Sequence, residues 1–352
     1  MKILYLYSEL MGYQIPVLKE YVTKYNAEVH VVHWDKKNLT PYKPLQISGV
    51  SYYLRSSFNG EKLNKFITKL EPDITFVSGW MDFLYLKAVY LIRNRGGLVV
   101  CGFDDIWYKT IKQKLASFVF PLFKKLFYTH AWVTGPLQFE YAKRLSFKNE
   151  EIIYNCYSAD TEIFNKAYLD SKKQKEEKYP HKFLFVGRFE NVKGVDNLID
   201  AWSNIKKSKK AKDWELTLIG NGSLGKKISK SKDFKTINFL QPEDLVSEIK
   251  NYGCFILPSI FEPWAVVIHE FVTAGFPIIC SDICGASPVF VINSYNGYTF
   301  KASNSKDLEE KMLKIINSSD KELIQKSHRS NSLGRKITPE LTAASFISLI
   351  NK

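Results

Sequence analysis

The sequence lacks the features that define several broad classes of protein. Cysteines are few, and their odd number without the paired spacing of a zinc site or a redox motif indicates a reducing compartment: Cys101, Cys156, Cys254, Cys280 and Cys284. Uninterrupted apolar runs of about 18 residues, the length of a membrane span, are also missing. The apolar start at residues 3–7 turns polar at Ser8 and is too short for a signal peptide. We therefore expect a cytoplasmic protein.

Acidic residues are outnumbered. The chain has 50 lysines and arginines against 36 acidic residues, which gives a formal net charge of +14. Such an excess favours anionic partners such as nucleotides, phospholipid headgroups or nucleic acid. No recognisable nucleic-acid-binding motif accompanies the basic residues, so we expect no nucleic-acid partner.

Apolar runs alternate with amphipathic stretches along most of the chain. In the first half this predicts strands at 2–7, 28–34, 73–78, 97–103 and 130–134 and helices at 14–25, 61–70, 82–94, 107–128 and 137–145. The second half predicts strands at 183–187 and near 215–219, 237–239, 254–257 and 277–280. Because strands separated by helices pair in parallel, we predict an α/β protein with two doubly wound, Rossmann-like domains.

A polar stretch separates the two series of strands. Residues 169–182 have almost no apolar content and include Pro180, as an interdomain linker would. This predicts a first domain at 1–168, a second at 183–336, and a C-terminal helix at 337–352 that packs back on the first. Two such domains are expected to face each other across a cleft. Ligands of open parallel sheets bind beyond the carboxyl ends of the strands.

The loop after the first strand of the second domain carries two cations. Arg188, directly after Gly187, offers a bidentate fork, and Lys193 offers a point charge. Together they can hold a diphosphate and neutralise charge that develops on it. The alternative is that both are surface charges beside a helix.

A second loop, Gly220 to Gly225, matches the dinucleotide-binding pattern G-x-G-x-x-G. Its glycines would let a phosphate approach backbone amides at a helix start. An NAD-dependent dehydrogenase is therefore a competing interpretation. Against it, the pattern lies in the middle of a domain and no catalytic histidine set accompanies it.

The segment 258–275 carries the strongest cluster. After a strand at 254–257, a loop presents Glu262, Pro263 suits the first helical position, and Glu270 lies two turns along the helix. Glu262 can accept hydrogen bonds from sugar hydroxyls, and Glu270 from the two hydroxyls of a ribose. The alternative, in which Glu262 caps the helix and Glu270 is solvated, is weakened because the helix is largely apolar and a buried carboxylate needs a partner.

The order of these motifs resembles glycosyltransferase family 4, a retaining family with the GT-B fold. The resemblance rests on a glycine loop after the first strand, Gly187-Arg188 with a later Lys193-Gly194, Gly220-x-Gly222, and Glu262-x7-Glu270 followed by Ala274-Gly275. The segment Ile153–Asp160 is also similar to the family's asparagine-containing segment at the end of the first domain.

The resemblance implies a role for each matching residue. Arg188 and Lys193 would bind the donor diphosphate, Glu262 the transferred sugar and Glu270 the ribose. Gly12 would let the first loop approach the donor, with an ordinary tight turn as the alternative. The residues implied to bind the donor are Gly12, Gly187, Arg188, Lys193, Gly220, Pro263, Trp264, Ala265, Val266 and Glu270.

Two departures from the family pattern bear on the substrates. Where the family has glycines around an aromatic residue, this chain has Pro263-Trp264-Ala265, which leaves the donor open. Where the family often has a histidine after the fifth strand, this chain has Asp104, which we expect to join Glu262, Arg188 and Lys193 as catalytic. The acceptor-side candidates are Tyr13, Trp80, Asp82 and Asp105. For the aspartates, helix capping is the alternative.

The resemblance implies that a hexose-type sugar moves from a UDP- or GDP-sugar to a saccharide or lipid-linked acceptor, as in the synthesis of a cell-surface polysaccharide. Anomeric configuration would be retained through an oxocarbenium-like transition state. Arg188, Lys193 and helix-start amides would supply the positive charge, so we expect neither a metal nor another cofactor. A sugar-nucleotide-binding protein without catalysis is a further alternative.

The predicted helix at 107–128 combines an apolar stripe with lysines. The stripe consists of Ile111, Leu115, Phe118 and Leu122, and its neighbours include Lys112, Lys114, Lys124 and Lys125. This pattern predicts peripheral docking on an anionic membrane surface. The alternative is that the stripe packs on the sheet and that Pro121 breaks the helix.

Overall fold

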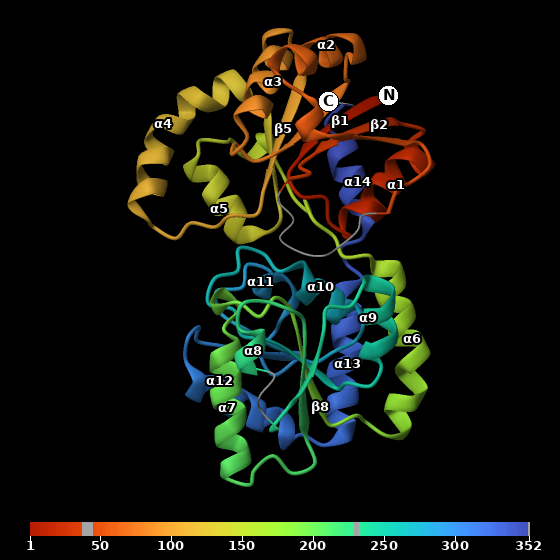
Figure 1. Ribbon diagram of the computed structural model, residues 1–352, viewed down its shortest axis with the longest axis vertical. Helices are drawn as coiled ribbons and strands as arrows, with labels where there is room; N and C mark the ends of the chain where they lie inside the picture. Colours follow the sequence, from red (N-terminus) through yellow and green to blue (C-terminus); the bar gives the residue numbers. More distant parts are fainter. Residues whose placement is uncertain (37–44, 229–231, 351–352) are drawn as a thin grey trace. The chain divides into compact units, whose positions relative to one another are not determined.

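A computed structural model describes residues 1–36, 45–228 and 232–350. The chain divides into two compact units (Figure 1). The first consists of Met1–Ser158 with Ile337–Lys352, and the second of Ala159–Lys336. Among the described residues, no helix is long and apolar enough to cross a membrane.

The first unit is built on a parallel sheet in the order β3-β2-β1-β4-β5-β6-β7. Its strands are β1 (Lys2–Tyr7), β2 (Glu28–His33), β3 (Val50–Leu54), β4 (Ile74–Ser78), β5 (Leu98–Phe103), β6 (His130–Val133) and β7 (Ile152–Ile153). Its helices are α1 (Gln14–Tyr25), α2 (Gly60–Leu70), α3 (Phe83–Asn94), α4 (Ile111–Phe127), α5 (Pro136–Arg144) and α14 (Pro339–Ile347).

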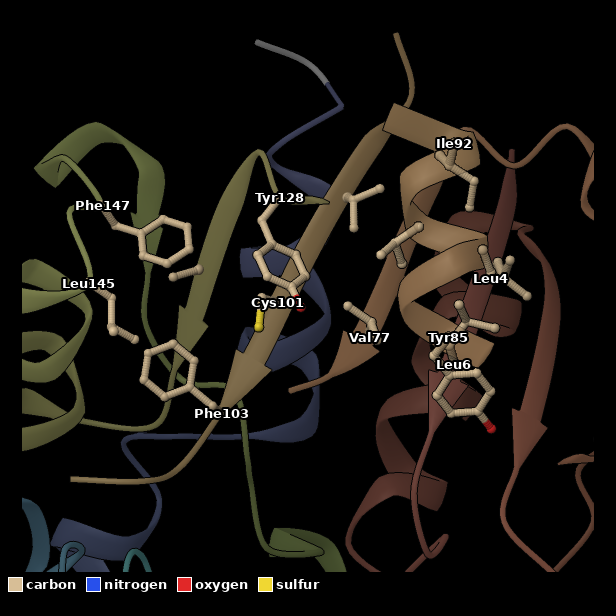
Figure 2. Packing of buried hydrophobic residues seen from close by; sticks show 14 of the residues in the cluster. Leu4, Leu6, Val77, Tyr85, Ile92, Cys101, Phe103, Tyr128, Leu145 and Phe147 are labelled. Atoms are coloured by element: carbon tan, nitrogen blue, oxygen red, sulfur yellow. The ribbon is translucent and has the colours of Figure 1, made fainter. Parts of the chain in front are cut away.

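Both faces of this sheet are covered, which explains why its central strands are apolar throughout. On one face, Leu4 and Leu6 of β1 lie close to Tyr85 and Ile92 of α3 (Figure 2). The Tyr85 hydroxyl donates to the backbone oxygens of Tyr7 and Val32, each at 3.0 Å. The buried Tyr85 hydroxyl therefore connects α3 to the ends of β1 and β2 by hydrogen bonds, in addition to the apolar packing.

The other face is covered by α1 and α14. Phe346 of α14 stacks on Trp132 of β6, with ring centroids 4.9 Å apart, and lies 5.8 Å from the rings of Tyr5 and Tyr21. The C-terminal helix thus belongs to the core of the first unit, although it follows the second unit in sequence.

The second unit has a parallel sheet in the order β10-β9-β8-β11-β12-β13. Its strands are β8 (Lys182–Val186), β9 (Glu215–Ile219), β10 (Lys235–Ile237), β11 (Cys254–Leu257), β12 (Ile278–Ser281) and β13 (Gly297–Phe300). Its helices are α6 (Thr161–Glu177), α7 (Val195–Lys207), α8 (Gly225–Ile228), α9 (Pro242–Ile249), α10 (Val266–Thr273), α11 (Ser287–Phe290), α12 (Ser305–Ile316) and α13 (Asp320–Gly334). Two parallel-sheet, Rossmann-like domains confirm the predicted fold class.

The stretch 169–182, for which the sequence predicts a linker, is mostly helix. It forms the second half of α6, and the second unit begins earlier, at Ala159. The helix is held by one buried face that includes Tyr168, Ser171 and Lys175. The Lys175 side chain crosses the ring of Phe276, with Nζ 4.0 Å from the ring centroid. Composition misleads here because a lysine can be buried when its ammonium group lies over an aromatic ring.

The helix predicted at 107–128 also differs from expectation. Helix α4 begins at Ile111, where the Thr110 side chain accepts from the amide of Gln113, and it continues through Pro121 to Phe127. A proline removes one hydrogen bond, and the packing of Phe120 and Phe123 on each other maintains the helix on both sides of it. The short edge strands β3, β7 and β13 were not expected from the sequence, because short strands give weak periodic signals.

Candidate functional site

The order of strands in the second unit marks where a ligand would bind. Strand β8 lies between β9 and β11, so the connections run in opposite directions from it. At such a switch point, the loops beyond the carboxyl ends of the two central strands separate and leave a crevice. The loops concerned follow β8 and β11. They contain the predicted residues Arg188, Lys193 and Glu262.

Backbone hydrogen bonds connect these two loops. The amide of Ile260 donates to the carbonyl oxygen of Val192 at 2.9 Å, and Phe261 donates to the same oxygen at 3.3 Å. Gly194 has a φ of 64°, and a Cβ added there would lie 1.9 Å from the carbonyl oxygen of Pro258. Only glycine permits this approach. The position of Lys193 is therefore fixed by the loop that carries Glu262.

Lys193 and Glu262 form an ion pair through Nζ and Oε2. The side chains are 17% and 11% exposed, so the pair is largely withdrawn from water. Ser259 Oγ donates to the same Glu262 oxygen at 2.9 Å, and the Ser259 carbonyl accepts from Ser281 Oγ at 2.6 Å. Glu262 is thus oriented before any ligand arrives. The structure brings together two residues that the sequence assigned to separate parts of a donor.

The glycine-rich loop at 220–225 packs against the loop that follows β8. Gly220 has a φ of 150°, and a Cβ there would lie 1.9 Å from the carbonyl oxygen of Gly187. A Cβ on Gly222 would lie 2.5 Å from the carbonyl oxygen of Phe189. The amide of Phe189 donates to the oxygen of Asn221 at 2.9 Å. Close packing of two loops accounts for the first two glycines, so the pattern does not favour a dinucleotide site.

Glu190 completes this contact between the loops. Its carboxylate accepts from the Ser223 hydroxyl at 2.6 Å and from the Ser223 amide at 2.9 Å, and these bonds lower the pKa of Glu190. Arg188 stands beside it, partly exposed, and adds to the lowering by its charge. Arg188 remains the accessible cation of this loop, at the carboxyl end of β8.

The start of α10 corrects the expected position of Pro263. The helix begins at Val266, and Ala265 precedes it with a φ of 85°, a left-handed conformation. Pro263 therefore lies in the loop, three residues before the helix. Trp264 is buried, and among the described residues its Nε1 has no hydrogen-bond partner. The sequence Pro-Trp-Ala thus forms a strained turn between Glu262 and the helix.

Glu270 lies on α10 about one turn after Val266, and not two turns along the helix as the sequence predicted, because the helix begins later than expected. Burial, together with the negative charge of Asp160, raises the pKa of Glu270 to about 7. Asp160 caps α6, where its side chain accepts from the amide of Ile163 at 3.3 Å. Sequence reasoning did not single out Asp160. Asp160 is the last residue of the family-like segment Ile153–Asp160, and that position is the signal that could have identified it.

His269, beside Glu270, is a second residue that sequence reasoning did not select. It is fully buried, its Nδ1 accepts from the amide of Ala159 at 3.0 Å, and its Nε2 donates to the carbonyl oxygen of Gly334 at 2.8 Å. The ring stacks on Phe290 with centroids 4.4 Å apart. His269 therefore connects α10, the helix that bears Glu270, to Ala159 and Gly334, which lie near the start and the end of the second unit in sequence.

The first unit has its own switch point, between β1 and β4. Gly12 and Tyr13 follow β1, and the rings of Tyr13 and Tyr157 lie 5.1 Å apart. Burial raises the pKa of both tyrosines, and the negative charge of Asp104, after β5, raises them further. The structure therefore brings Asp104 near Tyr13 at the carboxyl end of this sheet.

The other acceptor-side candidates have structural partners. Asp82 caps α3, accepting from the amides of Leu84 and Tyr85, and it also accepts from Arg55 Nε at 2.8 Å and Trp34 Nε1 at 2.9 Å. Although burial opposes it, these bonds lower the pKa of Asp82. Both carboxylate oxygens of Asp82 already accept hydrogen bonds within the first unit, which favours the interpretation of Asp82 as a helix cap.

Trp80 and Asp105 are also engaged within the first unit. Trp80 packs between Phe103 and Phe120, at 5.7 and 5.2 Å between ring centroids. Asp105 Oδ1 accepts from the amide of Ile106 at 3.0 Å, and burial raises the pKa of Asp105. Among the acceptor-side candidates, Tyr13 lies near Asp104, and Asp105 is the next residue in the chain.

The second unit matches a known family. Residues 169–332 match the family model described as glycosyl transferases group 1. The capsular polysaccharide biosynthesis glycosyltransferase CapM of Staphylococcus aureus is 25% identical over 86% of this chain and 85% of its own length. An uncharacterised glycosyltransferase of Methanocaldococcus jannaschii, MJ1178, is 32% identical over 39% of this chain. The chain spans 38% of the length of MJ1178 and 39% of an uncharacterised glycosyltransferase of Haemophilus influenzae.

Solved structures show the same fold over the whole chain. The Anabaena protein Alr3699/HepE in complex with UDP has a TM-score of 0.73 at 13% identity, with full coverage of both chains. An Escherichia coli structure described as trehalose-6-phosphate bound with UDP-2-fluoro glucose has a TM-score of 0.74 at 12% identity and covers 100% and 99% of the two chains. Fold and family match together support a glycosyltransferase of GT-B fold, and they do not favour a dehydrogenase.

Proposed function

We propose that this protein is a retaining glycosyltransferase of family 4 type that transfers a hexose-type sugar from a nucleotide diphosphate donor to a saccharide or lipid-linked acceptor. The observation that carries the proposal is the Lys193–Glu262 pair at the switch point of the second unit, with Arg188 on the adjoining loop. A cation for the diphosphate and a carboxylate for the sugar are thereby adjacent, as transfer from a sugar diphosphate requires.

The proposed reaction exchanges one bond at the anomeric carbon for another. The bond from that carbon to the diphosphate oxygen breaks, and the acceptor oxygen bonds to the same face. The acceptor's proton passes to the departing diphosphate oxygen, so no separate base is needed. Arg188 and Lys193 neutralise the charge that develops on the diphosphate. Lys193 has three donors, so it can keep Glu262 while it binds a phosphate oxygen.

The substrates are proposed from the relatives. We favour UDP as the donor nucleotide, because several of the similar structures are complexes with UDP or a UDP-sugar derivative. A role in cell-surface polysaccharide synthesis is supported by the similarity to CapM. A cytoplasmic location is part of the proposal, supported by five cysteines that are all buried and free. The absence of a metal or cofactor requirement stays a prediction, which chelation by EDTA would test.

Ligand binding and turnover together test the proposal. We expect UDP to raise the melting temperature more than GDP or NAD does, since a ligand at 100 times its Kd stabilises by about 2.7 kcal/mol. NMR of the product should show retained anomeric configuration. Glu262→Gln should mainly lower kcat, and Glu270→Gln should mainly raise the donor KM, each by about ten- to a hundredfold. Stabilisation by NAD alone, or wild-type kinetics for both variants, would refute the proposal. Donor binding without turnover would favour a non-catalytic binding protein.

A further inference from the structure

Helix α4 exposes a large apolar face to solvent. Six large apolar side chains on it are between 50 and 86% exposed: Ile111, Leu115, Phe118, Val119, Leu122 and Leu126. Their spacing places them on one side of a helix with 3.6 residues per turn. We call this set the α4 face. The exposure of these residues contradicts the alternative in which the stripe packs on the sheet, since Phe120 and Gln113, on the opposite side, are the buried residues.

The neighbouring helix α3 also carries exposed apolar side chains and packs on the other side of α4. Tyr90 of α3 packs on Phe127 of α4, with ring centroids 5.8 Å apart. Near the start of α3, Met81 and Phe83 are 81% and 69% exposed. Lys87 lies over the Phe83 ring, with Nζ 4.7 Å from the centroid. Six large apolar side chains exposed on one side of a helix mark a place of contact with another surface.

The charges on helix α4 itself are all of one sign. The helix contains four lysines and no acidic residue. Lys112 lies at one edge of the face and Lys114 and Lys125 at the other, and all three are exposed. Lys124 points elsewhere and pairs with Glu151, so it belongs to the fold and not to this surface. Apolar side chains bordered on both sides by lysines match a bilayer interface, where acyl chains lie beneath anionic headgroups.

We infer that the α4 face is a docking surface for an anionic lipid bilayer, on which α4 lies parallel to the membrane plane. A second copy of the chain fits less well, because a two-fold contact through this face would bring the two sets of lysines together. The inference goes beyond the proposed function, since it depends on none of the residues placed in the donor site.

Flotation of the full-length chain with vesicles tests the inference. The protein should float with vesicles of phosphatidylcholine and phosphatidylglycerol in equal parts, and not with phosphatidylcholine alone. Binding should weaken as sodium chloride is raised, because salt screens the lysine charges. The triple variant Lys112→Glu, Lys114→Glu, Lys125→Glu and the double variant Phe118→Ser, Leu122→Ser should each weaken binding at least about tenfold.

A matched control changes the same charge elsewhere. The variant Lys207→Glu, Lys209→Glu, Lys210→Glu alters three exposed lysines of the second unit and should float as the wild type does. Circular dichroism and UDP binding in solution should be the same for all variants, which separates this inference from the proposed function. Absent flotation, or equal loss in the control, would overturn it. Self-association in analytical ultracentrifugation that the Phe118→Ser, Leu122→Ser variant abolishes, with no vesicle binding, would assign the face to a second copy.

Discussion

Lys193 is paired with Glu262, so the cation proposed for the donor diphosphate is already bound to the carboxylate proposed for the transferred sugar. The two residues come from the loops after β8 and β11, and those loops are bonded to each other through Val192 and Ile260. Removing one partner of a largely buried pair leaves the other charge without compensation. Lys193 is therefore expected to affect both stability and binding.

The first prediction contrasts Lys193→Ala with Arg188→Ala. Both should weaken UDP binding and leave uridine binding nearly unchanged, because both cations address phosphates. Only Lys193→Ala should also lower the free energy of unfolding, by about 1 to 3 kcal/mol, since it leaves Glu262 unpaired. Calorimetry and urea denaturation measure the two effects. Equal losses for uridine and UDP would contradict the assignment to phosphates.

A double variant separates the two roles of Lys193. In Lys193→Ala with Glu262→Gln, no unpaired charge remains, so part of the lost stability should return while UDP binding stays weak. The measured coupling free energy in this cycle should be at least about 1 kcal/mol. Additive losses would mean that the pair contributes nothing to the fold.

The raised pKa of Glu270 predicts that stability depends on pH. The pKa rises from an ordinary value of 4.5 to about 7, so between these values the folded protein holds a proton that the unfolded chain has lost. The contribution to stability is present below about pH 4.5 and is lost as the pH rises through about 7, by at most about 3 kcal/mol in total. Glu270→Gln should remove this dependence, measured as unfolding free energies of wild type and variant across that range.

The same ionisation should act on donor binding in the opposite direction. An ionised Glu270 accepts hydrogen bonds from both ribose hydroxyls, whereas its protonated form offers fewer acceptor sites. Affinity for UDP should therefore rise as the pH increases through about 7, and in Glu270→Gln this rise should disappear. A pH profile that is the same in wild type and variant would place the ribose elsewhere.

Ala265 predicts a stabilising substitution. At a φ of 85° its Cβ is unfavourable, so Ala265→Gly should raise the free energy of unfolding by about 1 kcal/mol. Ala344, in the middle of α14, is the matched control, because Ala344→Gly at a helical position should lower stability by about 1 kcal/mol. Thermal denaturation of the two variants checks the opposite signs. A loss of stability in Ala265→Gly would contradict the strained turn.

Substitutions of Asp82 and Asp104, at the carboxyl end of the first sheet, should have different effects on stability and activity. Asp82→Ala removes a helix cap and the partner of Arg55, so we expect it to cost about 2 to 4 kcal/mol of stability. Asp104→Asn should leave the melting temperature nearly unchanged and lower kcat. Melting curves and steady-state rates on both variants distinguish the roles. A large loss of stability in Asp104→Asn would make it structural as well.

The sequence by itself determined the class of fold and most of its elements. Strands such as Lys2–Tyr7 and Cys254–Leu257 are apolar enough to be recognised alone, because parallel strands buried on both faces read as continuous apolar runs. Arg188, Lys193 and Glu262 could be found from the sequence for a related reason, since each lies between such a strand and the next α-helix. Glu270 could be found because it is a carboxylate in a largely apolar helix.

The tertiary structure alone decided what those residues touch. The spacing of residues cannot show that Lys193 pairs with Glu262, that Asp160 acts on Glu270, or that Asp82 is occupied by Arg55, because these partners lie far apart in sequence and meet only when the strands assemble. The same holds for burial. The apolar residues of α4 are exposed and Lys175 is buried, since a side chain's environment depends on what packs against it and not on its own polarity.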